Sequence, residues 1–345
     1  MKSIKIIILG FIILLNQQTK AQETSENNNW KGNRPDGHAP ISLMADHYHS
    51  KGGFMFSYRF MNMNMSGLLN GSNTISNDEA HSAGYMVTPL KMPMQMHMFG
   101  LMYAPSNKIT LLAMANVIKN DMDLQMRMMN TTSPFSTASS GFGDLKLGLI
   151  YKFLNKNQHS FHGNLTFSLP TGSISETDET PMSSPNEIQL PYPMQIGSGT
   201  FDTNLGFTYL GQKETFSWGS QLKGTFRFGK NSNNYAFGNS YNLNNWLAIK
   251  ATDWLSLSAR IEGIIVNEIR GEDANLTPMM VTTADTTNSG GTYANSGFGF
   301  NLYAPKGKLK DVRLGFEYAF PLYQKPNGIQ LELKETITVG LQYAM

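Results

Sequence analysis

The chain has 345 residues, of which 40% are hydrophobic and only 15% are charged, against about 25% charged in ordinary soluble domains. Its 27 basic and 25 acidic residues nearly cancel, which excludes a general nucleic-acid binder because such a protein needs a basic face. The absence of cysteine excludes disulfide scaffolds, thiolate zinc sites, cysteine nucleophiles and an N-terminal lipoprotein anchor.

The N-terminal 21 residues have the pattern of a secretory signal. Lys2 and Lys5 flank the start of the apolar run Ile6–Leu15, and the small Ala21 ends the segment. This run is too short to span about 30 Å of hydrocarbon as a helix, and no later run approaches the ~20 apolar residues required. We therefore expect three parts: a cleaved signal peptide (1–21), a periplasmic N-terminal segment (22–52) and a β-barrel (53–345).

Apolar and polar residues alternate with a period of two along the remaining chain, which predicts strands with one apolar and one polar face. In the first strand, Phe54, Phe56, Tyr58 and Phe60 form the apolar face, and Ser57 and Arg59 lie between them. The sequence predicts twelve such strands, at roughly 53–65, 92–104, 109–126, 141–153, 160–170, 200–210, 214–229, 243–252, 254–266, 293–304, 310–320 and 331–345.

The predicted connections alternate between short and long. The long ones are 66–91, 127–140, 171–199, 230–242, 267–292 and the shorter 321–330. This alternation is typical of a single antiparallel transmembrane β-barrel with short periplasmic turns and long external loops, an all-β fold of the outer membrane. A soluble β-sandwich is the alternative, and the long aromatic faces of the strands disfavour it.

Charged residues follow the same phase. Those on the face opposite the aromatic residues are assigned to the lumen: Arg59, Lys146, Lys152, Lys223, Arg227, Arg260, Glu262, Arg313, Glu317, Glu332 and Lys334. Only Glu335 falls on the apolar face, where a charge at mid-bilayer would cost ~2–4 kcal/mol. The excess of basic charge in the lumen mildly favours anionic or aromatic solutes.

Two resemblances support a barrel. The last eight residues, Thr338–Met345, resemble the C-terminal signal that the outer-membrane assembly machinery recognises, although Met345 replaces the usual aromatic end. The Phe54–Phe60 strand, the run Gly143-Asp144-Leu145-Lys146-Leu147 and the run Leu169-Pro170-Thr171-Gly172 resemble the outer-membrane transporter barrels named for the meta-pathway of phenol degradation, here in a Met-rich variant. The resemblance implies a channel or uptake barrel and no catalytic residue.

Methionine is concentrated between Met44 and Met129, which hold 16 of the 21 methionines after the initiator. On three successive strands these residues share the lumen phase, and the candidate set is Met61, Met63, Met65, Met92, Met94, Met96, Met98, Met122, Met126 and Met128. Met114 has the same phase. The spacing Met-x-Met-x-Met excludes a helical stripe.

The methionine set allows more than one interpretation. The thioethers could be flexible packing in an irregular lumen. They could be soft ligands for Cu(I) or Ag(I), or a polarizable wall along which an apolar solute slides. A fourth interpretation places them beyond the membrane, under a loop that plugs the barrel.

Histidines and candidate enzyme motifs add little. Asp46-His47-Tyr48-His49 could bind Cu(II) or Zn(II), but we favour a solvated linker because no fourth ligand is visible. His97 is out of phase with the methionines and is expected to face lipid or the membrane interface. We expect no enzyme, because no nucleophile, base and orienting group can be assembled.

The sequence thus predicts an outer-membrane channel for a small solute with a Met-lined external vestibule, and no certain cofactor. The alternative is a copper- or silver-binding barrel, for which Cu(I) would be the ligand. The expected partners are outer-membrane lipids and lipopolysaccharide, the barrel-assembly machinery, and a small-molecule or metal-ion solute, with no nucleic acid.

Overall fold

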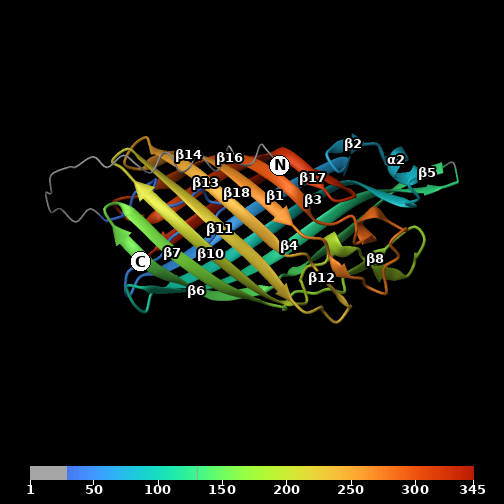
Figure 1. The fold of residues 1–345 in the computed structure, drawn as a ribbon, viewed down its shortest axis with the longest axis horizontal. Helices are drawn as coiled ribbons and strands as arrows, with labels where there is room; N and C mark the ends of the chain where they lie inside the picture. The colour runs from blue at the N-terminus through green and yellow to red at the C-terminus, as the bar shows by residue number, and fades with distance from the viewer. Residues whose placement is uncertain (1–28, 130) are drawn as a thin grey trace, which may run out of the picture.

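The computed structural model describes residues 29–129 and 131–345, so the predicted signal peptide lies outside the described residues. The chain forms a closed antiparallel barrel of 12 strands, which confirms the predicted fold class (Figure 1). Each strand pairs with its neighbour along the wall, and the last strand pairs with the first to close the barrel. Over the described residues, no helix is both long and apolar enough to cross a membrane.

The wall consists of β1 (Phe54–Asn70), β3 (Val87–Tyr103), β4 (Ile109–Met128), β5 (Thr131–Phe142) with β6 (Leu145–Lys156), β7 (His159–Leu169), β10 (Phe201–Gln212), β11 (Phe216–Phe228), β13 (Ser240–Lys250), β14 (Leu255–Val266), β16 (Gly291–Tyr303), β17 (Val312–Pro326) and β18 (Ile329–Ala344). The connections contain β2 (Asn73–Ile75), α2 (Asn77–Ser82), β8 (Thr177–Glu179), β9 (Glu187–Gln189), η1 (Tyr192–Met194), β12 (Tyr235–Ala236), β15 (Arg270–Gly271) and η2 (Thr282–Ala284).

The two ends of the barrel differ. The C-terminus and most of the tight turns lie at one end, which we call the turn end, whereas α2, β5, β8 and β12 lie at the other, the loop end (Figure 1). At the loop end, Leu190, Met194 and Val281 from the connections pack against Met122 and Met126 of β4. These connections therefore fold over the mouth and form an apolar cluster there.

Two of the predicted long loops are strands instead. Residues 131–142 form β5, which pairs with Val117–Met128 of β4, while β6 pairs with the other half of β4 at Ile109–Met114. The predicted loop at 321–330 is reduced to a tight turn between Pro326 and Ile329. The Ser- and Thr-rich segment 131–142 was predicted as a loop, but a long neighbouring edge with unpaired backbone groups draws it into the sheet.

A bulge changes the phase of β18. Met65 pairs with Leu333 although the preceding Asn64 pairs with Glu335, so the extra residue lies on β18. As a result Leu331 and Leu333 line the interior, and the prediction that Glu332 and Lys334 face the lumen is wrong. Glu335 accepts hydrogen bonds from Asn64 Nδ2 at 2.9 Å and from Tyr318 Oη at 3.0 Å.

Candidate functional site

The N-terminal part of the described chain, residues 29–52, lies inside the barrel and is called the plug below. The backbone N–H of Trp30 donates to Asn155 Oδ1 at 2.9 Å, and that of Lys51 donates to Asn107 Oδ1 at 2.9 Å. Both acceptors lie at or beside tight turns of the turn end. The plug therefore enters and leaves the lumen at the same end, and it connects directly to β1.

Between these two points the plug reaches strands on all sides of the lumen. Its hydrogen-bonded wall partners are Thr110 on β4, Ser160 and His162 on β7, Ser217 and Gln221 on β11, Ser256 on β14, Arg313 and Glu317 on β17, Gln342 on β18 and Arg59 on β1. Because most of these partners are buried polar side chains, the plug satisfies groups that an empty lumen would leave to water.

The innermost part of the plug rests on a charged network. Ser42 Oγ donates to both Glu317 carboxylate oxygens, at 2.8 and 2.9 Å. Arg260 forms ion pairs with Glu317 at 2.6 Å and with Glu262 at 3.0 Å, and it donates to Asn244 Oδ1 at 2.7 Å. The network thus joins β13, β14 and β17 at the position where the plug turns back.

Apart from Glu332 and Lys334, the other residues assigned to the lumen by sequence also point inward. Lys146, Lys223 and Arg227 line a cavity of about 270 Å³ together with Asp144 and Asp202. The remaining three contact the plug: Lys152 lies over the Tyr48 ring at 5.2 Å, Arg313 donates to the carbonyl oxygens of Pro35 and Arg34 at 2.7 Å each, and Arg59 Nη1 lies 2.9 Å from Met44 Sδ.

Three of the candidate methionines line a cavity of about 480 Å³. Met61, Met63 and Met65 border it from β1, and Arg260, Glu262 and Glu317 border it from β14 and β17. In the register of β1 and β3, Met61 lies opposite Met96, Met63 opposite Met94, and Met65 opposite Met92. We call these six residues the methionine wall. Directly opposed side chains have Cβ atoms about 4.5–5.5 Å apart, so the thioethers are close neighbours.

The other candidate methionines are dispersed. Met122 and Met126 are buried in the apolar cluster at the loop end, where Met92 of the methionine wall also packs. Met98 lies opposite Arg59, further toward the turn end. Met128, at the end of β4, is 55% exposed and belongs to neither group. His97 lies outside the set, as its phase predicts, and shares a 2.8 Å hydrogen bond with Tyr58 Oη on the outer face.

Asp46 and His47 of the plug are not solvated, so the sequence-based prediction of a solvated linker is wrong for these two residues. Asp46 and His47 are 3% and 6% exposed. Burial lowers the pKa of His38 well below its usual range and that of His49 to about 3. Burial alone would raise the pKa of Asp46, but His47, His38 and Arg59 together hold it below its usual range. The rings of His38 and His49 therefore favour the neutral form in the folded protein.

Sequence reasoning missed Met44 and Met194 as members of the interior. Met44 reaches Arg59 from the plug, and Met194 is buried beside Met122 from the connection between β7 and β10. Neither lies in a segment with a period of two, so no pattern could have assigned a face to it.

Comparison with known proteins supports the fold but assigns the chain to no family. No family model and no curated protein matches this sequence. The COG4313 outer membrane channel from Pseudomonas putida F1 is similar over 88% of this chain and 100% of that chain, with a TM-score of 0.61 and 12% identity. The P. putida toluene transporter TodX matches over 86% and 90% of the two chains, with a TM-score of 0.43 and 9% identity. Of these two, the first is similar enough to support the fold assignment, a closed antiparallel β-barrel.

Proposed function

We propose that this chain is a channel of the bacterial outer membrane that passes a small solute through a Met-lined vestibule. We propose that residues 1–21 are a cleaved export signal, and that the chain is a Met-rich member of the transporter barrels named for the meta-pathway of phenol degradation. The apolar side chains exposed on the outer face, such as Phe99, Leu101, Tyr151 and Leu257, suit contact with lipid. Outer-membrane lipids, lipopolysaccharide and the barrel-assembly machinery are the partners that this location requires.

The observation that carries the proposal is a pair of adjoining cavities inside a closed barrel wall, one bordered in large part by apolar side chains and one mainly by polar side chains. Cavities of about 480 and 270 Å³ share Lys223 as a lining residue, so a solute could pass from one to the other along a single side chain. Lys146, Lys223 and Arg227 outnumber Asp144 and Asp202 in the smaller cavity. Such a basic lining favours an anionic solute, through the same electrostatics that set selectivity in other pores.

Ion conductance tests this proposal. We expect the purified chain to conduct in planar bilayers, with a reversal potential that shows a preference for anions. Lys146→Gln combined with Lys223→Gln should reduce that preference because it removes two of the three cations in the smaller cavity. Lys119→Gln, in an exposed pair with Asp121 on β4, is the matched control and should leave the reversal potential unchanged. A wild-type protein that never conducts would overturn the proposal.

The second candidate function is the handling of Cu(I) or Ag(I). It is favoured by one specific observation, the three opposed pairs of thioethers on β1 and β3. Thioether sulfur is a soft ligand that selects Cu(I) and Ag(I) over Mg²⁺, Ca²⁺ or Zn²⁺, and it needs no deprotonation. Two other interpretations of the methionine wall involve no metal coordination: simple packing, and the sliding of an apolar solute along it. Both predict that the protein has no affinity for Cu(I) or Ag(I).

Substitution of methionine by leucine distinguishes metal binding from packing and from the sliding of an apolar solute. Leucine keeps the volume and apolarity of methionine, so Met92→Leu, Met94→Leu and Met96→Leu together should preserve folding but abolish Cu(I) binding measured calorimetrically under reducing conditions. The control triple is Met55→Leu, Met102→Leu and Met114→Leu, which changes sulfurs that pack together elsewhere in the barrel. Equal affinity in all three proteins, or none in the wild type, would exclude metal handling by the wall and leave the solute channel.

A further inference from the structure

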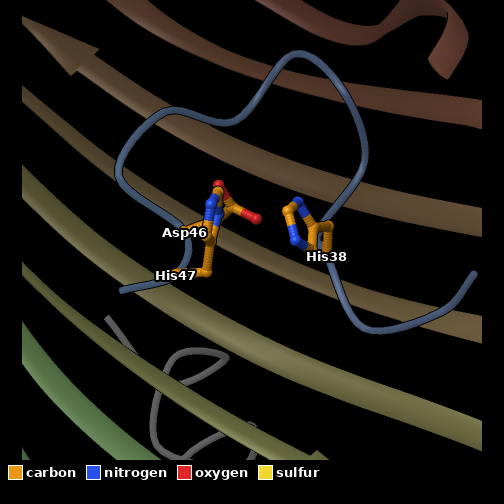
Figure 2. A group of neighbouring side chains, drawn as sticks. All are labelled: His38, Asp46 and His47. Atoms are coloured by element: carbon orange, nitrogen blue, oxygen red, sulfur yellow. The ribbon is translucent and has the colours of Figure 1, made fainter. Parts of the chain in front are cut away.

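A second group of ligand-type side chains lies in the plug, apart from the methionine wall. His38, Asp46 and His47 each offer a ligand atom, and these atoms lie within 4.8 Å of one another. Figure 2 shows the His38 ring facing the Asp46–His47 pair across a loop of the plug. The ring centroids of His38 and His47 are 3.9 Å apart, and those of His47 and His49 are 5.1 Å apart. Three imidazoles and one carboxylate therefore share one small volume.

Two nitrogen atoms of this group are buried without a hydrogen-bond partner among the described residues. They are Nε2 of His47 and Nε2 of His49. A buried polar atom left unpaired costs about 1–3 kcal/mol, and such atoms are rare in native proteins. His47 is only 6% exposed, so bulk water does not supply the missing partner. The two open nitrogens therefore point to a ligand.

The carboxylate of Asp46 fixes the proton on His47. Its Oδ2 accepts a hydrogen bond from the Ala39 backbone N–H at 3.0 Å, and its Oδ1 lies 2.9 Å from His47 Nδ1. A carboxylate can only accept, so His47 Nδ1 donates, and Nε2 is the ring nitrogen left to act as a ligand. This is the arrangement by which a carboxylate orients a metal-binding imidazole.

His38 is held in the same way. Its Nδ1 lies 3.2 Å from Gln342 Oε1 on β18, an atom that accepts hydrogen bonds. The opposite nitrogen, Nε2, is therefore left with a free lone pair. Asp46 in the plug and Gln342 on β18 thus orient the imidazoles of His47 and His38 as ligands.

The surroundings decide which class of ion would bind. Asp46 supplies one negative charge, and the guanidinium groups of Arg59 and Arg313 lie close enough to act on the group electrostatically. Ca²⁺ and Mg²⁺ depend on several oxygen ligands and would be bound poorly here. Neutral imidazoles suit Zn²⁺, Cu²⁺ and Ni²⁺, whose bonds to nitrogen do not require a surplus of carboxylates. A cavity of about 400 Å³ borders all three rings and leaves space for an ion with a water ligand.

We propose that the plug binds a divalent first-row transition-metal ion through the imidazoles of His38, His47 and His49, with Asp46 orienting His47. The site is independent of the methionine wall in ligand type and in cavity. It would tie together two parts of the plug that are eight residues or more apart in the sequence, His38 and Asp46–His47, at the turn-end side of the network around Glu317.

Titration of the full chain in detergent with Zn²⁺ alone, and separately with Cu²⁺ alone, tests the proposal. We expect one ion to bind per chain, His47→Ala to weaken binding at least tenfold, and Asp46→Asn to weaken it ~10–100-fold because it removes only the orienting charge. His97→Ala, on the outer face, is the control for adventitious histidine binding and should leave the affinity unchanged. Met61→Leu, Met63→Leu and Met65→Leu should also have no effect on Zn²⁺ binding.

Electron paramagnetic resonance of the Cu²⁺-loaded wild type is the second measurement, and it decides the matter even if His47→Ala fails to fold. Hyperfine coupling to several imidazole nitrogens is the expected result. The proposal is overturned by the absence of binding to the wild type, by a spectrum without nitrogen coupling, or by equal affinity in a folded His47→Ala variant. Binding of Ca²⁺ with the same affinity as Zn²⁺ would overturn the proposed ligand class.

Discussion

The methionine wall and the plug hold their polar and polarizable groups in different ways. On the wall, the position of Met63 opposite Met94 follows from a continuous ladder of backbone hydrogen bonds between β1 and β3. In the plug, His47 and His38 are positioned by single side-chain contacts to Asp46 and Gln342. A ladder tolerates the loss of one side chain, whereas a loop fixed by side chains does not. The same substitution should therefore have different consequences in the two regions.

The largest loss of stability is expected where the barrel wall contacts the plug. Glu317→Ala leaves the Arg260 guanidinium with Glu262 as its remaining ion-pair partner and removes the acceptor of Ser42. Removal of one partner of a buried ion pair costs about 3–5 kcal/mol. We expect a loss near the lower end of this range in urea unfolding, together with faster proteolysis within residues 29–52. Lys334→Ala, which breaks the more exposed pair with Glu332, is the control and should change stability by less than about 1 kcal/mol.

The next effect concerns the apolar cluster at the loop end. Met122 is fully buried there, so Met122→Ala should lower the free energy of unfolding by about 2–5 kcal/mol through lost contacts and a new cavity. Met128→Ala, at an exposed position on the same strand, should be close to neutral. Equal losses in the two variants would show that the cluster does not stabilise the barrel.

A smaller effect on stability is expected from a substitution that displaces the plug from the barrel wall. Ile41 of the plug packs against Gly315 and Gly340, which pair directly on β17 and β18. A Cβ atom at Gly340 would lie 2.7 Å from Ile41 Cγ1, so Gly340→Val should push the plug away at a cost of about 1–3 kcal/mol. The strand itself accepts valine readily. We expect higher single-channel conductance from a barrel that is still folded.

Gly263→Val on β14 is the control for this prediction, because no atom lies within 4 Å of the added Cβ. It should leave the conductance as in the wild type. A Gly340→Val protein with wild-type conductance and unchanged proteolysis would show that the plug is not seated on these glycines.

The smallest loss of stability is expected from substitutions of similar volume in the methionine wall. Met61→Leu, Met63→Leu and Met65→Leu should each cost less than about 1.5 kcal/mol, because the cavity that they line allows the side chains to adjust. Thermal unfolding in detergent measures this. A larger loss from Met63→Leu than from Met122→Ala would contradict the distinction between a cavity lining and a packed cluster.

The sequence predicted the β-barrel fold because the rule for strands is local. A period of two assigns Met61, Met63 and Met65 to one face without knowledge of any other strand. The same rule failed for Glu332 and Lys334, since a bulge adds one residue on β18 and nothing in the composition of that strand marks it. It also assigned residues 131–142 to a loop, because strand formation there depends on the edge of β4.

The plug could not be predicted from the sequence by any rule of this kind. Its conformation is set by partners such as Arg313 and Gln342, which lie 278 and 304 residues away from the groups they bind. Asp46-His47-Tyr48-His49 was visible as a candidate metal motif, but the sequence could not show that His38 would meet it. Burial of the group depends on the closed wall around it, and so on every strand at once.

The path of the plug also constrains the order of folding. It precedes β1 in the chain, yet its contacts extend to β17 and β18, the final strands, through Pro35–Arg313 and His38–Gln342. Contacts with such large separations along the chain form slowly, although the entropy of closing the loop rises only with the logarithm of its length. The plug, although it precedes every strand in the chain, would thus adopt its final conformation last, after β1 and β18 have paired and closed the barrel.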